Sequence, residues 1–150
     1  MATSGSKAVE GQKMSMTDLF FRYIPLAGSA SALAFSLNVM NPTFFRSVFS
    51  PNELLVANSL WFNAHLGIGL YLYGRRHMRQ GTTYQRVLFS VFGTVLFNFG
   101  SVLFWATTRA LILKNDVLRS LFGIGTGIAM LFIGKEYLDF IDGSMSKELD

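Results

Sequence analysis

His65 is the side chain whose type and position come closest to a chemical site in this sequence. It lies just past the middle of a long apolar stretch, seven residues after Asn58 on the same helical face. Thr94, Asn98 and Ser101 form a second polar group in a later apolar stretch. We expect these five side chains to hydrogen-bond across helix interfaces in a membrane, each bond contributing about 0.6 kcal/mol. The alternative is that His65 binds a haem, a quinone or a lipid head group.

A haem or metal site would need more ligands than this chain supplies. The only other histidine is His77, twelve residues after His65, which places it about 120° round a helix and outside the apolar stretch. The chain has no cysteine, which excludes cysteine-ligated zinc, iron–sulfur clusters and thiol nucleophiles. We therefore predict no cofactor and no metal ion.

Catalytic and nucleotide-binding motifs are also missing. No carboxylate lies inside a spanning stretch, whereas proton relays and ion-coupled carriers rely on such groups. The serines and threonines lack the histidine and acid partners of a nucleophilic triad. Gly123 and Gly127 belong to a glycine run within an apolar helix, without the strand and the Lys-Ser/Thr pair of a phosphate loop. The sequence thus favours a protein that is not an enzyme.

Small residues recur at helical spacing in the first and last apolar stretches. Gly28, Ala32 and Ser36 follow one another every four residues, and Gly123 and Gly127 are separated by four. Small side chains at this spacing let two helices approach closely in a membrane. We predict that both groups are helix-packing surfaces.

Four basic residues, Arg75, Arg76, His77 and Arg79, follow the second apolar stretch. They anchor the topology of the chain, and they are also a candidate site for an anionic lipid such as cardiolipin or a phosphoinositide. Each basic residue near a membrane surface contributes about 1 kcal/mol to such binding. Nucleic acid is not expected as a partner, because no basic face is interleaved with stacking aromatics.

The composition requires a membrane around these residues. Apolar residues make up 51% of the 150 residues and charged residues only 15%, and 15 residues are Phe. Several apolar stretches approach or exceed the roughly 20 residues that cross a bilayer. We predict an all-α integral membrane protein with four transmembrane helices in an up-down bundle with short loops. A polar N-terminal tail (1–18) and an acidic C-terminal tail (141–150) flank a transmembrane domain (19–140) whose helices cover approximately 19–40, 51–73, 84–113 and 117–139.

Local signals refine the ends of these helices. Pro25 is expected either to kink the first helix or to mark where an interfacial turn becomes its spanning part. Residues 43–49 are expected to form an apolar interfacial turn. Residues 50–53 (Ser-Pro-Asn-Glu) read as a capping box for the second helix. Gly74 is expected to end that helix as a left-handed cap.

The basic residues also predict the orientation. With four crossings, the N-terminal tail, the loop after the second helix and the C-terminal tail share one side of the membrane. That side holds nine Lys and Arg residues against four on the other. By the positive-inside rule, both termini face the cytosol, or the matrix of a mitochondrion.

Three functions fit this outline. The favoured one is a structural or accessory subunit of a larger complex of membrane subunits, in the mitochondrial inner membrane as part of the respiratory chain or ATP synthase. The second is an endoplasmic-reticulum scaffold for lipid- or sterol-biosynthetic enzymes. In size and hydropathy alone, the chain resembles the ergosterol-biosynthesis scaffold family. The third is a small membrane enzyme, or a lipid-, quinone- or haem-binding protein, that uses His65.

Overall fold

The computed structural model describes residues 15–111 and 114–147. The predictions for most of the N-terminal tail, for residues 112–113 and for residues 148–150 lie outside this part. All regular structure in the described residues is helical, which confirms the all-α prediction there. The elements are α1 (Met16–Asp18), a π-helical turn η1 (Leu19–Tyr23), α2 (Ile24–Met40), α3 (Pro42–Phe49), α4 (Glu53–Tyr73), a 3-10 turn η2 (His77–Gln80), α5 (Thr83–Leu111) and α6 (Asp116–Lys147).

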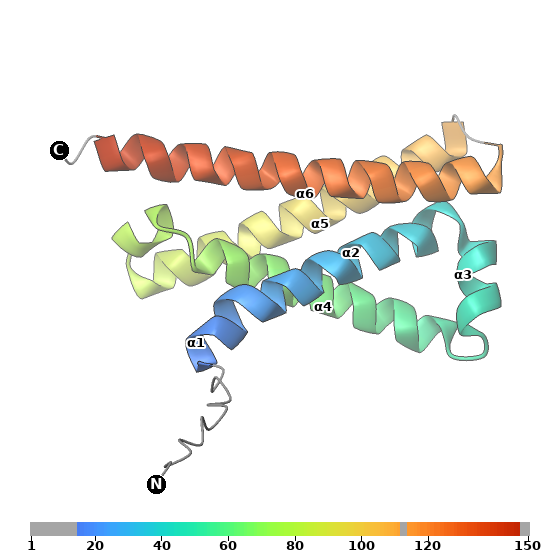
Figure 1. Cartoon of the computed structure of the whole chain (residues 1–150), viewed down its shortest axis with the longest axis horizontal. Helices are drawn as coiled ribbons and strands as arrows, with labels where there is room; N and C mark the ends of the chain where they lie inside the picture. The colour runs from blue at the N-terminus through green and yellow to red at the C-terminus, as the bar shows by residue number, and fades with distance from the viewer. Residues whose placement is uncertain (1–14, 112–113, 148–150) are drawn as a thin grey trace, which may run out of the picture.

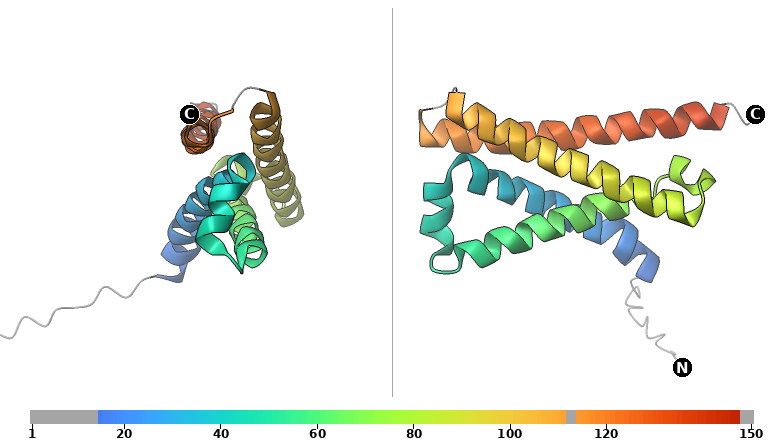
Figure 2. Two further views of the ribbon diagram at one scale, coloured as in Figure 1. Left: turned by 90° about the vertical axis from the view of Figure 1, so that its right-hand side faces the viewer. Right: turned by 180° about the vertical axis from the view of Figure 1, so that it is seen from behind.

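Four long helices, α2, α4, α5 and α6, extend along the long axis of the molecule, and consecutive ones run in opposite directions (Figure 1). The short helix α3 lies across one end, whereas α1, η2 and the last turns of α6 lie towards the other end (Figure 2). The second helix, α2, is central, because it packs against α4, α5 and α6. Its most extensive contact is with α4.

Three helical stretches in the described part of the chain are long and apolar enough to cross a membrane: Met16–Met40, Thr83–Leu111 and Asp116–Met145. The remaining long helix, α4, has 21 residues but carries Asn58, Asn63 and His65. These polar residues interrupt its apolar sequence, and α4 is not among the three stretches that are apolar enough to cross a membrane. In length and composition, these three helices are consistent with a multi-pass membrane protein.

Pro25 is accommodated by a local change of helix type. Its ring lacks an N–H and crowds the carbonyl four residues earlier, at Phe21. The widened π-helical turn Leu19–Tyr23 lies directly before it, and the amide of Ile24 donates to the carbonyl of Leu19, five residues back. The chain from Met16 to Met40 is therefore one continuous helical stretch with a π turn near its start.

The segment between α2 and α4 differs from the expected turn. Residues 42–49 form α3, which begins at Pro42 and is capped by the Asn41 side chain, an acceptor from the amide of Phe44 at 3.1 Å. The capping-box prediction is wrong, because Ser50 already ends α3 and α4 begins at Glu53 without a side-chain cap. The Glu53 carboxylate instead pairs with Arg46 of α3 at 3.2 Å.

Two other helix ends also differ from expectation. Gly74 has right-handed φ and ψ angles (−76°, −10°), so the predicted left-handed cap is wrong. Its lack of a side chain serves packing instead, because a β-carbon there would lie 2.8 Å from Cδ1 of Phe21. At the other end of the chain, α6 continues to Lys147 rather than ending near Asp139.

Candidate functional site

Helices α2 and α4 approach each other closely at a contact of two glycines. A β-carbon added to Gly28 of α2 would lie 2.5 Å from the Cα of Gly67 of α4, and one added to Gly67 would lie 2.6 Å from the Cα of Gly28. Backbone carbonyls of Asn63 and Ile24 lie nearly as close to these added atoms. Because the neighbours are backbone atoms, no side-chain rotation creates the missing space. The two helix backbones touch at this point.

The other predicted small residues lie on the same central helix and on the helix facing it. Ala32 and Ser36 of α2 are buried. A β-carbon on Gly123 of α6 would meet Met40 at 2.9 Å and the Ser36 hydroxyl at 3.3 Å. One on Gly127 would meet Leu33 at 2.8 Å. Glycines thus line the side of α6 that packs on α2.

The inner face of α5 is polar and its outer face is apolar. Six buried residues follow one another at three- or four-residue spacing, and five of them carry hydroxyl or carboxamide groups: Ser90, Thr94, Asn98, Ser101, Trp105 and Thr108. The exposed residues between Val87 and Phe104 are Val, Leu, Phe and one Gly. A helix of a water-soluble protein has the opposite distribution.

The predicted polar residues of α5 make their hydrogen bonds within their own helix. Thr94 donates to the carbonyl of Ser90 at 2.6 Å, Asn98 to Thr94 at 3.0 Å and Ser101 to Phe97 at 2.7 Å. Within residues 15–111 and 114–147, these groups do not form the expected bonds across the helix interface. Buried hydroxyl and amide groups can donate a hydrogen bond to the backbone carbonyl one turn earlier in the same helix. This local bond competes with a bond to a neighbouring helix.

Hydrogen bonds between helices come instead from residues near the helix ends and from Trp105. The Trp105 indole donates to Thr126 of α6 at 3.0 Å. Arg109 of α5 donates to the carbonyl of Val39 at 2.7 Å, which satisfies a free acceptor in the last turn of α2. The Asn41 side chain donates to Ser120 of α6 at 3.0 Å. These bonds fix α5 and α6 to α2 at the α3 end of the molecule.

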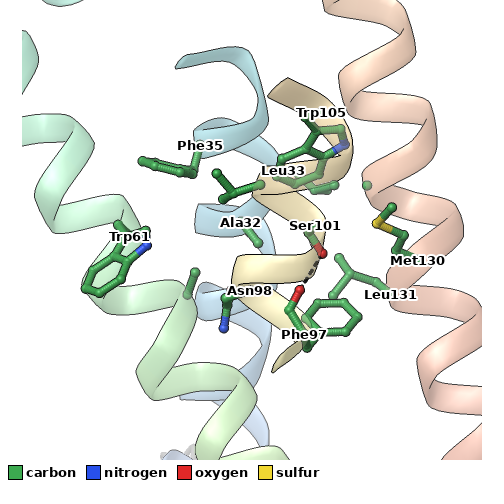
Figure 3. A pocket seen from close by; sticks show the side chains of 13 residues that line it. Ala32, Leu33, Phe35, Trp61, Phe97, Asn98, Ser101, Trp105, Met130 and Leu131 are labelled. Atoms are coloured by element: carbon green, nitrogen blue, oxygen red, sulfur yellow. Dashed lines mark hydrogen bonds between the residues drawn. The ribbon is translucent and has the colours of Figure 1, made fainter. Parts of the chain in front are cut away.

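A small cavity lies between the four long helices. It is lined by Trp61 and Ala64 of α4, by Asn98 and Ser101 of α5, and by residues of α2 and α6 (Figure 3). Its volume of about 20 Å³ is enough for a single water molecule. A quinone or a haem does not fit in this space.

His65 is held by aromatic neighbours. Its Nδ1 lies 2.8 Å from the carbonyl of Trp61, and because a carbonyl only accepts, Nδ1 donates this bond. The ring lies tilted by 43° against Trp61, with the ring centroids 3.9 Å apart, and makes an edge-to-face contact with Phe99 of α5 at 6.0 Å. Nε2 is buried and has no partner within the described residues. The polar contacts of His65 are therefore within α4.

Asn58 does not join His65 in a buried pair. Its side chain is exposed and makes no hydrogen bond to any residue in the described part of the chain. The same is true of Asn63, the central residue of α4. The predicted interhelical contact of Asn58 is thus absent among the residues that the structure describes.

Two residues of the basic cluster are bound to α6. Arg75 pairs with Asp139 and, at 2.9 Å, with Asp142. His77 donates its backbone amide to Asp142 at 2.8 Å and places Nδ1 2.7 Å from the same carboxylate. The side chains of Arg75 and Asp142 are both only 13% exposed. We call this group of four residues the ionic latch, because it ties the end of α4 to the end of α6.

The ionic latch lowers the pKa of its two carboxyl groups, Asp139 and Asp142. Both lie beyond Lys135, outside the uncharged stretch of α6. Partial burial tends to raise the pKa of Asp142, but the His77 amide and imidazole and the Arg75 guanidinium outweigh it and lower that pKa. Hydrogen bonds from Lys135 and Arg75 lower the pKa of Asp139. Both aspartates therefore hold their negative charge more strongly than a free carboxyl.

The remaining members of the basic cluster have a different environment. Arg76 and Arg79 are exposed, and their side chains have no ion-pair partner among residues 15–111 and 114–145. They border an open depression that is also lined by two glycines and three of the latch residues: Gly74, Gly143, Arg75, Asp139 and Asp142. The positive charge available to an external anion at this site thus belongs to Arg76 and Arg79.

Several residues that organise the structure were missed by the sequence prediction. Gly67 was missed although the spacing of Ala57, Ala64 and Gly67 on one side of α4 was a usable signal. Asn41 and Arg109 could not be assigned, because their partners are distant in sequence. The pairing of Arg75 with Asp139 was missed for the same reason.

Comparison of the chain with protein-family models, with curated proteins and with solved structures found no match. The function is therefore argued from the geometry above.

Proposed function

We propose that this chain is a non-catalytic accessory subunit of a larger membrane protein complex, built from four membrane-crossing helices in an up-down bundle. The observation that carries the proposal is the inverted polarity of α5, which buries Thr94, Asn98 and Ser101 and exposes Val, Leu and Phe. Such a helix is stable when hydrocarbon, rather than water, surrounds it. Its exposed apolar residues are then covered by lipid or by other subunits.

The distribution of charge supports the same setting. Arg46, Glu53, Arg109 and Asp116 belong to the α3 end of the molecule, whereas the ionic latch belongs to the opposite end. In α6, no charged residue lies between Arg119 and Lys135. Two charged rims separated by uncharged helix are typical of a bilayer-spanning protein.

We propose α4 as the fourth span, although polar residues interrupt its apolar sequence. Its 21 residues cover about 31 Å at 1.5 Å per residue, close to the roughly 30 Å of the hydrocarbon core. It connects the two charged rims, and its backbone contacts α2 at Gly67. Packing against α2 offsets the cost of its polar residues.

The packing of the interior supports a structural role over an enzymatic one. Glycine contacts close the space between α2 and its neighbours, and the central cavity has room for no more than one water molecule. Both termini are proposed to lie on the cytosolic or matrix side, with η2. Arg76 and Arg79 are proposed to bind anionic phospholipid head groups, cardiolipin among them.

We place the complex in the mitochondrial inner membrane, in the respiratory chain or ATP synthase. This placement rests on composition alone, since the chain is small, rich in Phe and carries a net charge of +4. The test is to solubilise the membrane gently and measure the size and composition of the native particle. We expect a particle with several other membrane subunits. A particle that contains only this chain would overturn the proposal, and localisation to the endoplasmic reticulum would replace the mitochondrial placement.

A further inference from the structure

The outer face of α4 differs from the outer faces of α5 and α6. Leu55, Ser59, Phe62 and Leu66 are exposed and follow one another at four-, three- and four-residue spacing, which places them along one line of the helix. Asn58 and Asn63 are exposed beside this line. We call these six residues the outer α4 face.

The two asparagines of this face lack hydrogen bonds. Each carboxamide has two N–H donors and an accepting oxygen, and neither makes a bond to the described residues. Asn63 lies at the middle of α4, and Asn58 lies about 7.5 Å from it along the helix axis. If α4 crosses the bilayer, both carboxamides lie at hydrocarbon depth.

Lipid chains cannot satisfy these groups. Hydrocarbon has no donor or acceptor, so an unpaired carboxamide in contact with it is costly. The hydroxyl of Ser59 is already satisfied, since it donates to the carbonyl of Leu55 at 2.8 Å. By contrast, the exposed residues of α5 between Val87 and Phe104 carry no polar side chain and are suited to lipid.

We propose that the outer α4 face binds a transmembrane helix of another subunit that carries carboxamide or hydroxyl side chains at the depths of Asn58 and Asn63. Ser59 supplies a small side chain for close approach at the centre of the face, and the two carboxamides flank the contact. The exposed Phe62 and Leu66 pack against the partner helix. This inference rests on the proposed accessory function. It identifies α4 as the helix of this chain that contacts the partner subunit.

Photo-cross-linking in the native membrane tests this surface. A benzophenone analogue of phenylalanine is placed at Phe62 of the full chain and, as a matched control, at Phe92 of α5. The two phenylalanines are 63% and 60% exposed, so they differ in the face they occupy rather than in accessibility. We expect the Phe62 probe to form a covalent adduct with one other membrane protein and the Phe92 probe to label only lipid.

The double substitution Asn58→Leu and Asn63→Leu shows whether the carboxamides hold the partner. The adduct from Phe62 should fall roughly five- to tenfold, the effect of losing two interhelical hydrogen bonds. Thermal unfolding of the purified variant in detergent should be unchanged or raised, because neither carboxamide bonds within the described chain. An undiminished adduct would contradict the role of the two asparagines.

Other adducts would overturn the proposed partner. A phospholipid adduct at Phe62 would mean that lipid covers this face, and a covalent dimer would mean that a second copy covers it. In both cases a native particle with several subunits would leave the accessory function standing. A particle that contains only this chain would instead remove the proposed function itself.

Discussion

Gly28 and Gly67 form a reciprocal backbone contact in which each glycine occupies the space that the other's side chain would need. The β-carbons built on them would lie 2.5 and 2.6 Å from the opposite Cα atoms. This contact is where the backbones of α2 and α4 meet, and it holds α4 against the central helix. Gly28 belongs to a small-residue repeat that the sequence reveals, whereas Gly67 becomes significant only when the two helices are seen together.

Gly67→Ala should destabilise the protein by about 1–3 kcal/mol, because the added methyl group forces two backbones apart. Gly125→Ala is the matched control on α6, since its β-carbon would meet nothing within 4 Å. The control should be neutral or stabilising by up to about 1 kcal/mol, the gain in helix propensity. Denaturant titration in detergent measures both. Equal stability of the two variants would contradict the assigned crossing point.

The ionic latch should make stability fall in acid. The pKa of Asp139 and that of Asp142 are lowered in the folded protein, from an ordinary value of 3.8. Groups of this kind stabilise the fold fully above their unfolded pKa, and they lose that contribution as pH falls through the folded pKa. The unfolding midpoint should therefore decline as pH drops towards 3.8 and below. Asp142→Asn should lower stability at neutral pH and flatten this decline.

Glu136→Gln is the control for the latch, because Glu136 lies on the same helix and is 57% exposed, with only a 3.7 Å contact to Lys135. Exposed pairs of this kind contribute about 0–1 kcal/mol. The unfolding midpoint of Glu136→Gln should depend on pH in the same way as that of the natural protein. A profile of Asp142→Asn that also matched would show that the latch does not stabilise the fold.

His65→Phe should leave the native particle assembled. Phenylalanine keeps a ring between Trp61 and Phe99, and it removes the buried Nε2 that has no partner in the described residues. Stability should change by less than about 1.5 kcal/mol, the usual limit for a swap that conserves volume in a packed site. The size of the native particle and the activity of the whole complex are measured for the variant and for the natural protein. Intact assembly with lost activity would instead support His65 as a ligand-binding residue.

Arg76→Gln combined with Arg79→Gln should weaken the retention of cardiolipin by about 2 kcal/mol, since each basic residue contributes about 1 kcal/mol. Arg46→Gln is the control, because Arg46 is also exposed but lies at the α3 end and pairs with Glu53. Native mass spectrometry of the purified particle counts the bound lipids. Unchanged lipid retention in the double variant would exclude these two arginines as the lipid site.

The sequence predicts the class of structure because hydropathy and small-residue spacing are local signals. It places Gly28, Ser36 and Gly123 correctly at the packing surfaces of helices, although their partners appear only in the structure. The role of a residue at a helix end is harder to predict from sequence. The backbone angles of Gly74 are open to any residue, and glycine is needed there because a side chain would collide with Phe21. The extension of α6 depends on contacts of Asp139 and Asp142 with a loop far away in sequence, which no local pattern reveals.

The number of crossings can be measured directly, because the natural chain has no cysteine and single cysteines can be introduced without background. Cysteines at the exposed positions Ser15, Gln80 and Ser144 report on one end of the molecule, and cysteines at Ser47 and Asn115 report on the other. Sealed vesicles of known orientation are labelled with a membrane-impermeant maleimide. The account predicts that the first three positions react from one side and the last two only from the opposite side. Labelling of Gln80 and Ser47 from the same side would mean that α4 does not cross the membrane, and would contradict the four-span account.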